Sequence, residues 1–294
     1  MKNNKNTLSR RRFIGTSATF IAGATLTGPS LFGATGLRNT ALKPNSIING
    51  VQIGVITYSF RSMKDQSAEA TLKYVLDCGI NAIELMGDPA ETFAGRPENP
   101  VNFRAFYGLM RAKREGKELS EKEQKDLAEM QAKSDAFKKE VAEWRSTVSM
   151  DKFAALRKMY NDAGVTIYAF KPNAFGKDNT DAEIEWGLKA AKTLGASHVT
   201  LEHPSDDDHT KKLGAFGKKH GVYIAYHGHE QQTPTFWDTA LKQSKYNALN
   251  LDLGHYVAAG NTAPLEIVKS KHDRILSMHT KDRKNPANGK GNVV

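Results

Sequence analysis

Short apolar runs alternate with longer amphipathic segments along most of the chain after residue 50. Seven of these runs have the length and the β-branched and aromatic content of buried strands. They are "VQIGVITYSF" (51–60), "INAIELMG" (80–87), "VTIYAFKP" (165–172), "SHVTLEHP" (197–204), "VYIAYHGH" (222–229), "LNLDLGH" (249–255) and "ILSMHTKD" (275–282). Several of the segments between them have helical periodicity and end in glycine, as helices do where the following turn needs a positive φ. The pattern predicts consecutive parallel βα units.

The number of strands favours a closed barrel. Seven strands in order, without a glycine-rich dinucleotide-binding turn after the first, favour a (β/α)8 TIM barrel over an open doubly wound sheet. The polar segment "NPANGKGNVV" (285–294) follows the seventh strand. We therefore expect a TIM barrel over residues 48–294 that lacks its eighth βα unit in this chain, with an exposed edge between the first and seventh strands.

Residues 89–148 interrupt the repeat with a long, heavily charged segment. Its Glu/Lys pairs at helical spacing predict a helical insertion after the second strand, solvated on most faces. A coiled-coil partner site is the alternative. It is disfavoured because apolar a and d positions are not sustained over several heptads.

The first 40 residues form a separate segment. "SRRRFIG" (9–15) precedes an uncharged, weakly apolar stretch and resembles a twin-arginine export leader, whose arginine pair is recognised by a receptor. The resemblance implies a disordered or cleaved leader, recognition by the twin-arginine translocation machinery, and a periplasmic location. A membrane anchor is the alternative, but the Gly28-Pro29 break and the polarity of the stretch argue against a stable membrane span.

The distribution of charge restricts the possible partners. The chain of 294 residues has a formal net charge of +10, of which residues 1–40 contribute +6 and residues 281–294 contribute +3. The barrel region is therefore nearly neutral, which argues against a nucleic-acid partner. The single cysteine, Cys78, excludes an internal disulfide.

Acidic and histidine side chains recur at the ends of the predicted strands. All strands of a parallel barrel end at the same face, so these residues converge although they are far apart in sequence. They are Glu202, His203, His227, His229, Asp252, His255, His279, Lys281 and Asp282, and they include five of the nine histidines. Imidazole and carboxylate are the usual ligands of a borderline divalent cation. The pattern predicts one metal site with His227, Asp252 and His279 as ligands, whereas a lone histidine would more often bond a backbone carbonyl.

The segments "YHGHE", "LDLGHYVAAG" and "HTKD", in this order and spacing, resemble the xylose isomerase-like barrel family of sugar isomerases and epimerases. The resemblance implies one divalent cation (Mn, Zn, Co or Mg) held by His227, Asp252, His279 and an acid on a last strand, which would fall beyond Val294. Many epimerases of the family have a glutamate, which also serves as the base, where this chain has His227. The early segments "VITYSFRS" and "IELMG" supply no further histidine ligand.

The resemblance also implies a reaction. A cation bound to a keto-sugar would polarise its carbonyl and stabilise the enediolate that forms when a base removes the neighbouring C–H proton. Isomerisation or epimerisation of a carbohydrate is the first expectation, and a keto-glycoside lyase or hydrolase that uses the same intermediate is the runner-up. A non-catalytic sugar-binding barrel is a third possibility and an apurinic endonuclease the least favoured. The candidate groups are Glu202 and Glu230 as bases, His255 and Lys281 as acid or electrophilic helpers, and Lys171 and His229 as substrate contacts.

Overall fold

A computed structural model describes residues 43–289 of the chain. Seven parallel strands pair in sequence order into one curled sheet. They are β3 (Val55–Ile56), β4 (Ala82–Met86), β5 (Thr166–Lys171), β6 (His198–Glu202), β7 (Tyr223–His227), β8 (Asn247–Asp252) and β9 (Ile275–His279). The parallel barrel fold predicted from the sequence is confirmed. Within residues 43–289 the edge strands β3 and β9 do not pair, so the described part of the barrel is open between them. The predicted export leader lies outside the described residues.

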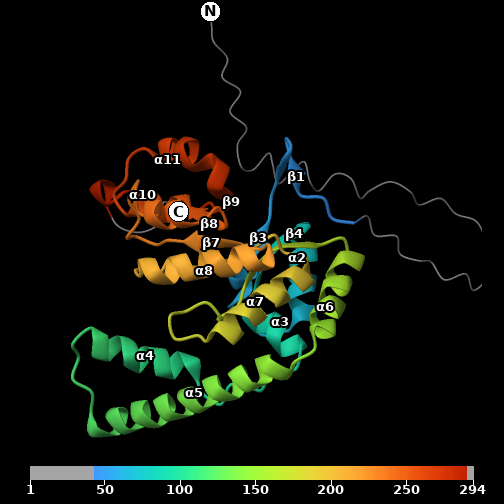
Figure 1. Ribbon diagram of the computed structural model, residues 1–294. Coiled ribbons are helices and arrows are strands. Elements are labelled where there is room, and N and C mark those ends of the chain that lie inside the picture. The colour runs from blue at the N-terminus through green and yellow to red at the C-terminus, as the bar shows by residue number, and fades with distance from the viewer. Residues whose placement is uncertain (1–42, 290–294) are drawn as a thin grey trace, which may run out of the picture. The chain divides into compact units, whose positions relative to one another are not determined.

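Helices cover the outside of the sheet (Figure 1). They are α2 (Ala68–Asp77), α6 (Met150–Asp162), α7 (Asp181–Leu194), α8 (Asp207–His220), α9 (Asp238–Gln243) and α11 (Pro264–Lys271). Helix α10 (Leu253–Ala258) follows β8 directly at the carboxyl end of the sheet, and the 3-10 turns η1 (Thr57–Phe60), η2 (His272–Arg274) and η3 (Pro286–Asn288) lie in the segments that follow β3, α11 and β9. Helix α7 shows why the boundaries fall where they do. Thr180 and Glu183 form a capping box at its start, and Gly195 ends it with a φ of 82°. No helix among residues 43–289 is both long and apolar enough to span a bilayer.

The prediction of one strand over residues 51–60 is wrong for most of that range. Only Val55 and Ile56 join the parallel sheet. Before them, β1 (Ile47–Ile48) and β2 (Val51–Gln52) form an antiparallel hairpin, because Asn49 and Gly50 adopt the positive φ angles that a tight hairpin turn requires. After them, residues 57–60 form η1 instead of continuing the strand.

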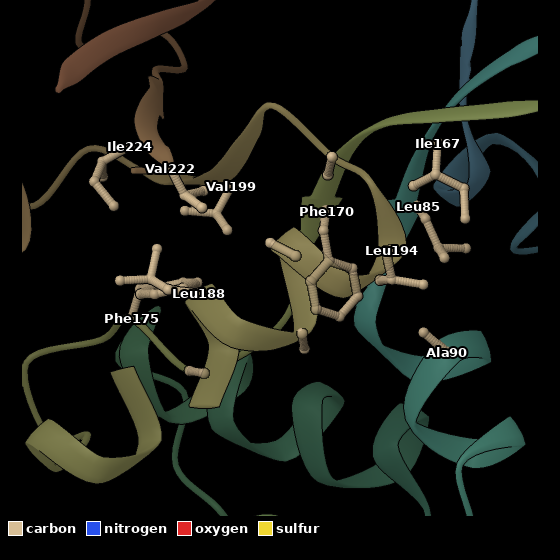
Figure 2. Close-up of a cluster of buried hydrophobic side chains, with 14 of the residues drawn as sticks. Leu85, Ala90, Ile167, Phe170, Phe175, Leu188, Leu194, Val199, Val222 and Ile224 are labelled. Carbon is tan, nitrogen blue, oxygen red and sulfur yellow. The ribbon is translucent and has the colours of Figure 1, made fainter. Parts of the chain in front are cut away.

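The core lies between the sheet and its helices. Figure 2 shows Phe170 of β5 packed among residues of the neighbouring elements, with Leu85 of β4 and Leu194 of α7 beside it. Because side chains alternate along a strand, the neighbours of these residues in sequence, such as Glu84 and Lys171, lie on the opposite, inner face. Thus the apolar outer face holds the helices, and a polar inner face is left to build a site.

Three helices fill the region between β4 and α6. They are α3 (Gly87–Phe93), α4 (Phe103–Arg114) and α5 (Glu121–Thr147). In Figure 1, α4 and α5 form a hairpin whose connecting loop points away from α6 and α7. Arg145 of α5 contacts the helices that pack on the barrel. Its guanidinium donates to Glu91 and to Glu183, each at 3.1 Å. The guanidinium also lies 4.6 Å from the ring centre of Trp186.

Candidate metal centre

The three predicted ligands are the last residues of three neighbouring strands. His227 ends β7, Asp252 ends β8 and His279 ends β9. Glu202, which ends β6, is level with His227 in the strand register, and Asp252 is level with His279. The β7–β8 register pairs Tyr226 with Leu249, so Asp252 lies further along its strand than His227, but all four side chains are at the carboxyl end of the sheet.

The donor atoms of the predicted ligands face one another. His227 Nε2 lies 3.3 Å from Asp252 Oδ2, and His279 Nδ1 lies 3.7 Å from the same oxygen. Adjacent ligands of a cation with bonds of about 2.1 Å are roughly 3.0 Å apart in octahedral and roughly 3.4 Å apart in tetrahedral geometry. The spacing of the three donors thus fits one divalent cation. A second group, Glu202, His227 and His229, also has its donor atoms within 4.8 Å of one another, but it is more exposed.

Each of the two ligand histidines has a carboxylate on its other ring nitrogen. His227 Nδ1 lies 3.0 Å from Glu202 Oε2, and His279 Nε2 lies 2.7 Å from Glu84 Oε2. An ionised carboxylate can only accept, so these nitrogens carry the ring protons. In the absence of a cation, His227 Nε2 and His279 Nδ1 face the acceptor Asp252, and a bound cation would take the place of protons on these two nitrogens. Carboxylate, histidine and metal in series are the usual arrangement of a protein metal site.

Glu84 is a site residue that sequence reasoning missed. It lies in the middle of β4, fully buried on the inner face, and accepts hydrogen bonds from Thr200 at 2.6 Å and from Asn250 at 3.2 Å. Burial raises the pKa of Glu84, but the hydrogen bonds from His279 and Thr200 and the positive charges of His279 and Lys171 together keep it below the ordinary value. The only sequence signal was an acid flanked by apolar residues in "AIELM", and that acid identifies no partner.

The cluster has strongly perturbed protonation equilibria. Burial alone would lower the pKa of His279, but hydrogen bonds with Asp252 and Glu84 raise it to about 9. Asp252 is fully buried, and its hydrogen bonds with His227, His279 and Lys281 hold its pKa well below the usual range. Lys281 Nζ lies 2.5 Å from Asp252 Oδ2, so an ammonium group occupies part of the space around the carboxylate that a cation would use.

The candidate base and substrate contacts surround this centre. Lys171 donates to Glu202 at 2.8 Å, and half of the Glu202 side chain is exposed at the mouth. Burial raises the pKa of Glu202, but His227 and Lys171 lower it far more. His229 Nδ1 lies 3.7 Å from Glu202 Oε2, so His229 is next to the candidate base.

His255 and Glu230 form the rim with Arg283. His255 ends the predicted strand 249–255, but the strand stops at Asp252. Asp252 caps the helix that follows, accepting the His255 backbone N–H at 2.8 Å, so His255 lies on α10. Arg283 donates to His255 Nδ1 at 3.2 Å and pairs with Glu230 at 2.5 Å. Arginine is only a donor, so the ring proton of His255 is on Nε2, 3.9 Å from Asp252 Oδ2. Burial lowers the pKa of His255 to about 4, which leaves it neutral at neutral pH.

Two other residues predicted at strand ends belong to neither group of candidate ligands. The His203 ring packs against Tyr226 and Phe236, with ring centres 5.0 and 4.7 Å away. Asp282 is exposed. A position at a predicted strand end therefore brings some of these residues to the candidate metal centre, but not all of them.

No protein-family profile and no curated protein sequence matches the chain. Among solved structures, the fold resembles the probable 3-DHS dehydratase AsbF of petrobactin synthesis from Bacillus anthracis, with 12% identity, coverage of 79% of this chain and 74% of that one, and a TM-score of 0.50. It also resembles a xylose isomerase-like TIM barrel/4-hydroxyphenylpyruvate dioxygenase fusion protein, with 15% identity, coverage of 80% of this chain and 32% of that one, and a TM-score of 0.50. A sugar phosphate isomerase/epimerase from Parabacteroides distasonis matches with 18% identity, coverage of 81% and 78%, and a TM-score of 0.47. At these identities the likeness concerns the fold alone, that of a parallel βα barrel.

Proposed function

We propose that the chain is a metal-dependent isomerase or epimerase that acts on a sugar or keto-sugar through an enediolate. The proposal is supported chiefly by one observation. Two histidines, each with a carboxylate on its far nitrogen, direct their other ring nitrogens toward the same buried carboxylate, Asp252. The sugar isomerases and epimerases among proteins of similar fold are consistent with this proposal, as are the sequence motifs.

His227, Asp252 and His279 would hold one divalent cation, Mn, Zn, Co or Mg. When bound, such a cation polarises a substrate carbonyl and stabilises negative charge on its oxygen. Lys281 must leave Asp252 for the cation to enter. Its side chain is 43% exposed, so it has room to turn toward the oxygens of a substrate at the mouth.

Glu202 is the better placed of the two candidate bases. Glu230 is held by Arg283 at the rim, whereas Glu202 lies beside His227 at the centre. The contact with Lys171 lowers the proton affinity of Glu202. A substrate hydroxyl or carboxylate that took the Lys171 hydrogen bond would make Glu202 a stronger base at the moment of binding.

His255 and His229 would hold and orient the sugar. Both rings are neutral at neutral pH, because burial lowers the pKa of each. The Nε2–H of His255 is directed to the centre and can donate to a substrate oxygen or return a proton to it. The mouth thus combines one base, two neutral imidazoles and two ammonium groups around the metal ligands.

Solvent exchange tests the proposal independently of the sugar's identity. The full chain, loaded in turn with each cation, is incubated in D2O with ketoses and keto-sugars, and deuterium at the carbon next to the carbonyl is followed by NMR. Removal of the C–H proton is common to isomerisation, epimerisation and elimination, and product analysis then separates them. We expect cation-dependent exchange that Asp252→Asn abolishes. An absence of exchange with every cation and sugar, or exchange unaffected by Asp252→Asn, would refute it.

We also propose that the protein is exported to the periplasm by the twin-arginine machinery, on the strength of the "SRRRFIG" motif. Replacing Arg10 and Arg11 by lysine should retain the protein in the cytoplasm. Cell fractionation of the parent and the variant measures this. Equal periplasmic amounts of both would contradict the proposal.

A further inference from the structure

Helix α4 presents an unusual surface for a helix on the outside of a barrel. None of its 12 residues is buried, although it contains four large apolar or aromatic side chains and a leucine. Phe103, Tyr107 and Met110 are 68%, 51% and 41% exposed. Their spacing of four and three residues places them on one face, and the Phe103 and Tyr107 rings stack with centres 5.8 Å apart.

The same helix is a concentrated source of positive charge. Arg104, Arg111, Lys113 and Arg114 lie on α4, which has no acidic residue. Residues 43–289 have a formal net charge of +3 and α4 alone contributes +4, so the rest of the described chain is close to neutral. Arg111 contacts Glu115 at 3.5 Å, while Arg104, Lys113 and Arg114 form no ion pair within the described residues.

A cleft between α4 and α5 is also lined by apolar and basic side chains. Its volume is about 760 Å³, and its lining includes the apolar residues Met110, Leu119 and Leu127 and the basic residues Lys113, Arg114 and Lys117. Apolar groups with adjacent cations match a ligand that has hydrocarbon next to an anionic group. A neutral protein surface would match the apolar stripe but would leave the cations unpaired.

We propose that α4 is an interfacial helix that docks the protein on an anionic lipid surface. Phe103, Tyr107 and Met110 enter the boundary between headgroups and acyl chains, and the arginines and lysines beside them bind the lipid phosphates. Because α4 lies outside the barrel and shares no residue with the candidate metal centre, this docking is independent of the proposed reaction. It also requires no spanning helix.

An environment-sensitive probe on α4 tests this in the full chain. Cys78 is the only cysteine and is exposed, so Cys78→Ser with Tyr107→Cys allows one NBD fluorophore to be attached on the helix. Leu265→Cys in the same background is the matched control, since Leu265 is 67% exposed on α11. Vesicles of equal parts phosphatidylglycerol and phosphatidylcholine are compared with phosphatidylcholine alone.

We expect a blue shift of the probe at position 107 with the anionic vesicles, reversed by high salt, and little change at position 265. In vesicle flotation of otherwise unmodified protein, Phe103→Ser should weaken binding about tenfold. Arg114→Gln should weaken it about fivefold, whereas Lys152→Gln, which removes an exposed charge from α6, should not. The comparison with the parent chain cancels any contribution from the basic N-terminal segment.

Three results would overturn the proposal. The first is no shift at position 107 with anionic vesicles. The second is an equal shift at positions 107 and 265. The third is a probe at 107 that is already shifted without lipid and responds to protein concentration, because a second copy of the chain would then cover the face. The first result, together with a response to single-stranded DNA, would identify a nucleic acid as the ligand in place of a lipid surface.

Discussion

Cation binding should release a proton from His279, and the structure determines how much. The pKa of this histidine is raised to about 9, against 6.5 for an ordinary imidazole. At pH 8.0 such a group is about 90% protonated, whereas an ordinary histidine is about 3% protonated. A cation that takes the Nδ1 lone pair displaces that proton. We therefore predict release of about 0.9 proton from His279 per cation bound at pH 8.0.

The proton and the cation compete for His279 Nδ1, and this competition determines how metal affinity changes with pH. Below a pKa of about 9, each unit of falling pH makes the proton a tenfold stronger competitor, so apparent metal affinity falls about tenfold per pH unit from this group. Above pH 9 the contribution of His279 levels off. Titration calorimetry with Mn²⁺ in buffers of different ionisation enthalpy measures both the affinity and the number of protons released.

Glu84→Gln provides the specific perturbation. The glutamine keeps the shape of the side chain but removes the charge that holds the His279 proton, so proton release at pH 8.0 should fall below about half. Loss of the carboxylate should also weaken metal binding about 10- to 100-fold. Glu98→Gln, an exposed glutamate on the outside, is the matched control and should change neither quantity. Circular dichroism checks that both variants are folded. Tight binding by the parent without proton release at pH 8.0, or unchanged release in Glu84→Gln, would refute the assignment of Nδ1 as the ligand atom.

Three further predictions concern other parts of the molecule. Asp252→Ala should abolish metal retention and turnover together, whereas His255→Ala should keep metal and lose turnover; elemental analysis beside the exchange assay separates the two, and full metal in Asp252→Ala would contradict the ligand set. Lys281→Met should tighten metal binding several-fold, because it removes the ammonium 2.5 Å from the Asp252 carboxylate, and should reduce turnover; unchanged affinity in the calorimeter would show that the lysine does not compete. Arg145→Leu should destabilise the fold by about 3–5 kcal/mol, because it leaves the buried Glu91 without its main partner, and urea unfolding that shifts by less than about 1 kcal/mol would show that the pair is not holding α5.

Much of the fold could be predicted because buried parallel strands are continuous apolar runs. "INAIELMG" and "VTIYAFKP" become β4 and β5 with few residues lost at each end. The prediction for the first run, residues 51–60, failed for a local reason. Asn49 and Gly50 favour a tight hairpin, and this preference diverts Val51 and Gln52 from the parallel sheet. The length of an apolar run does not reveal which of its residues the neighbouring strand will pair with.

The candidate ligands could be predicted and their supporting groups could not. His227, Asp252 and His279 end their strands, and a strand end is visible in the sequence. Glu84 lies inside a strand, and its contact with His279 spans 195 residues across the sheet, set by the strand register. The pairing of His255 with Arg283 likewise depends on where the chain runs after β9. Residues at the ends of elements are predictable from pattern, while contacts across the barrel require the fold.

The charges of the centre explain why three acids, two of them fully buried, can lie close together. Without a cation, the carboxylates Glu84, Glu202 and Asp252 face three positive groups, Lys171, Lys281 and the protonated His279. Their charges cancel, so the protein folds without leaving a buried charge uncompensated. A divalent cation that replaces the His279 proton adds two positive charges and removes one, which leaves the centre with a net charge of about +1. An enediolate oxygen that develops negative charge beside it would restore neutrality, whereas the neutral substrate would not. If the chain is the proposed isomerase or epimerase, the same groups would favour the charged intermediate over the substrate once a cation is bound, and such differential binding accelerates proton abstraction.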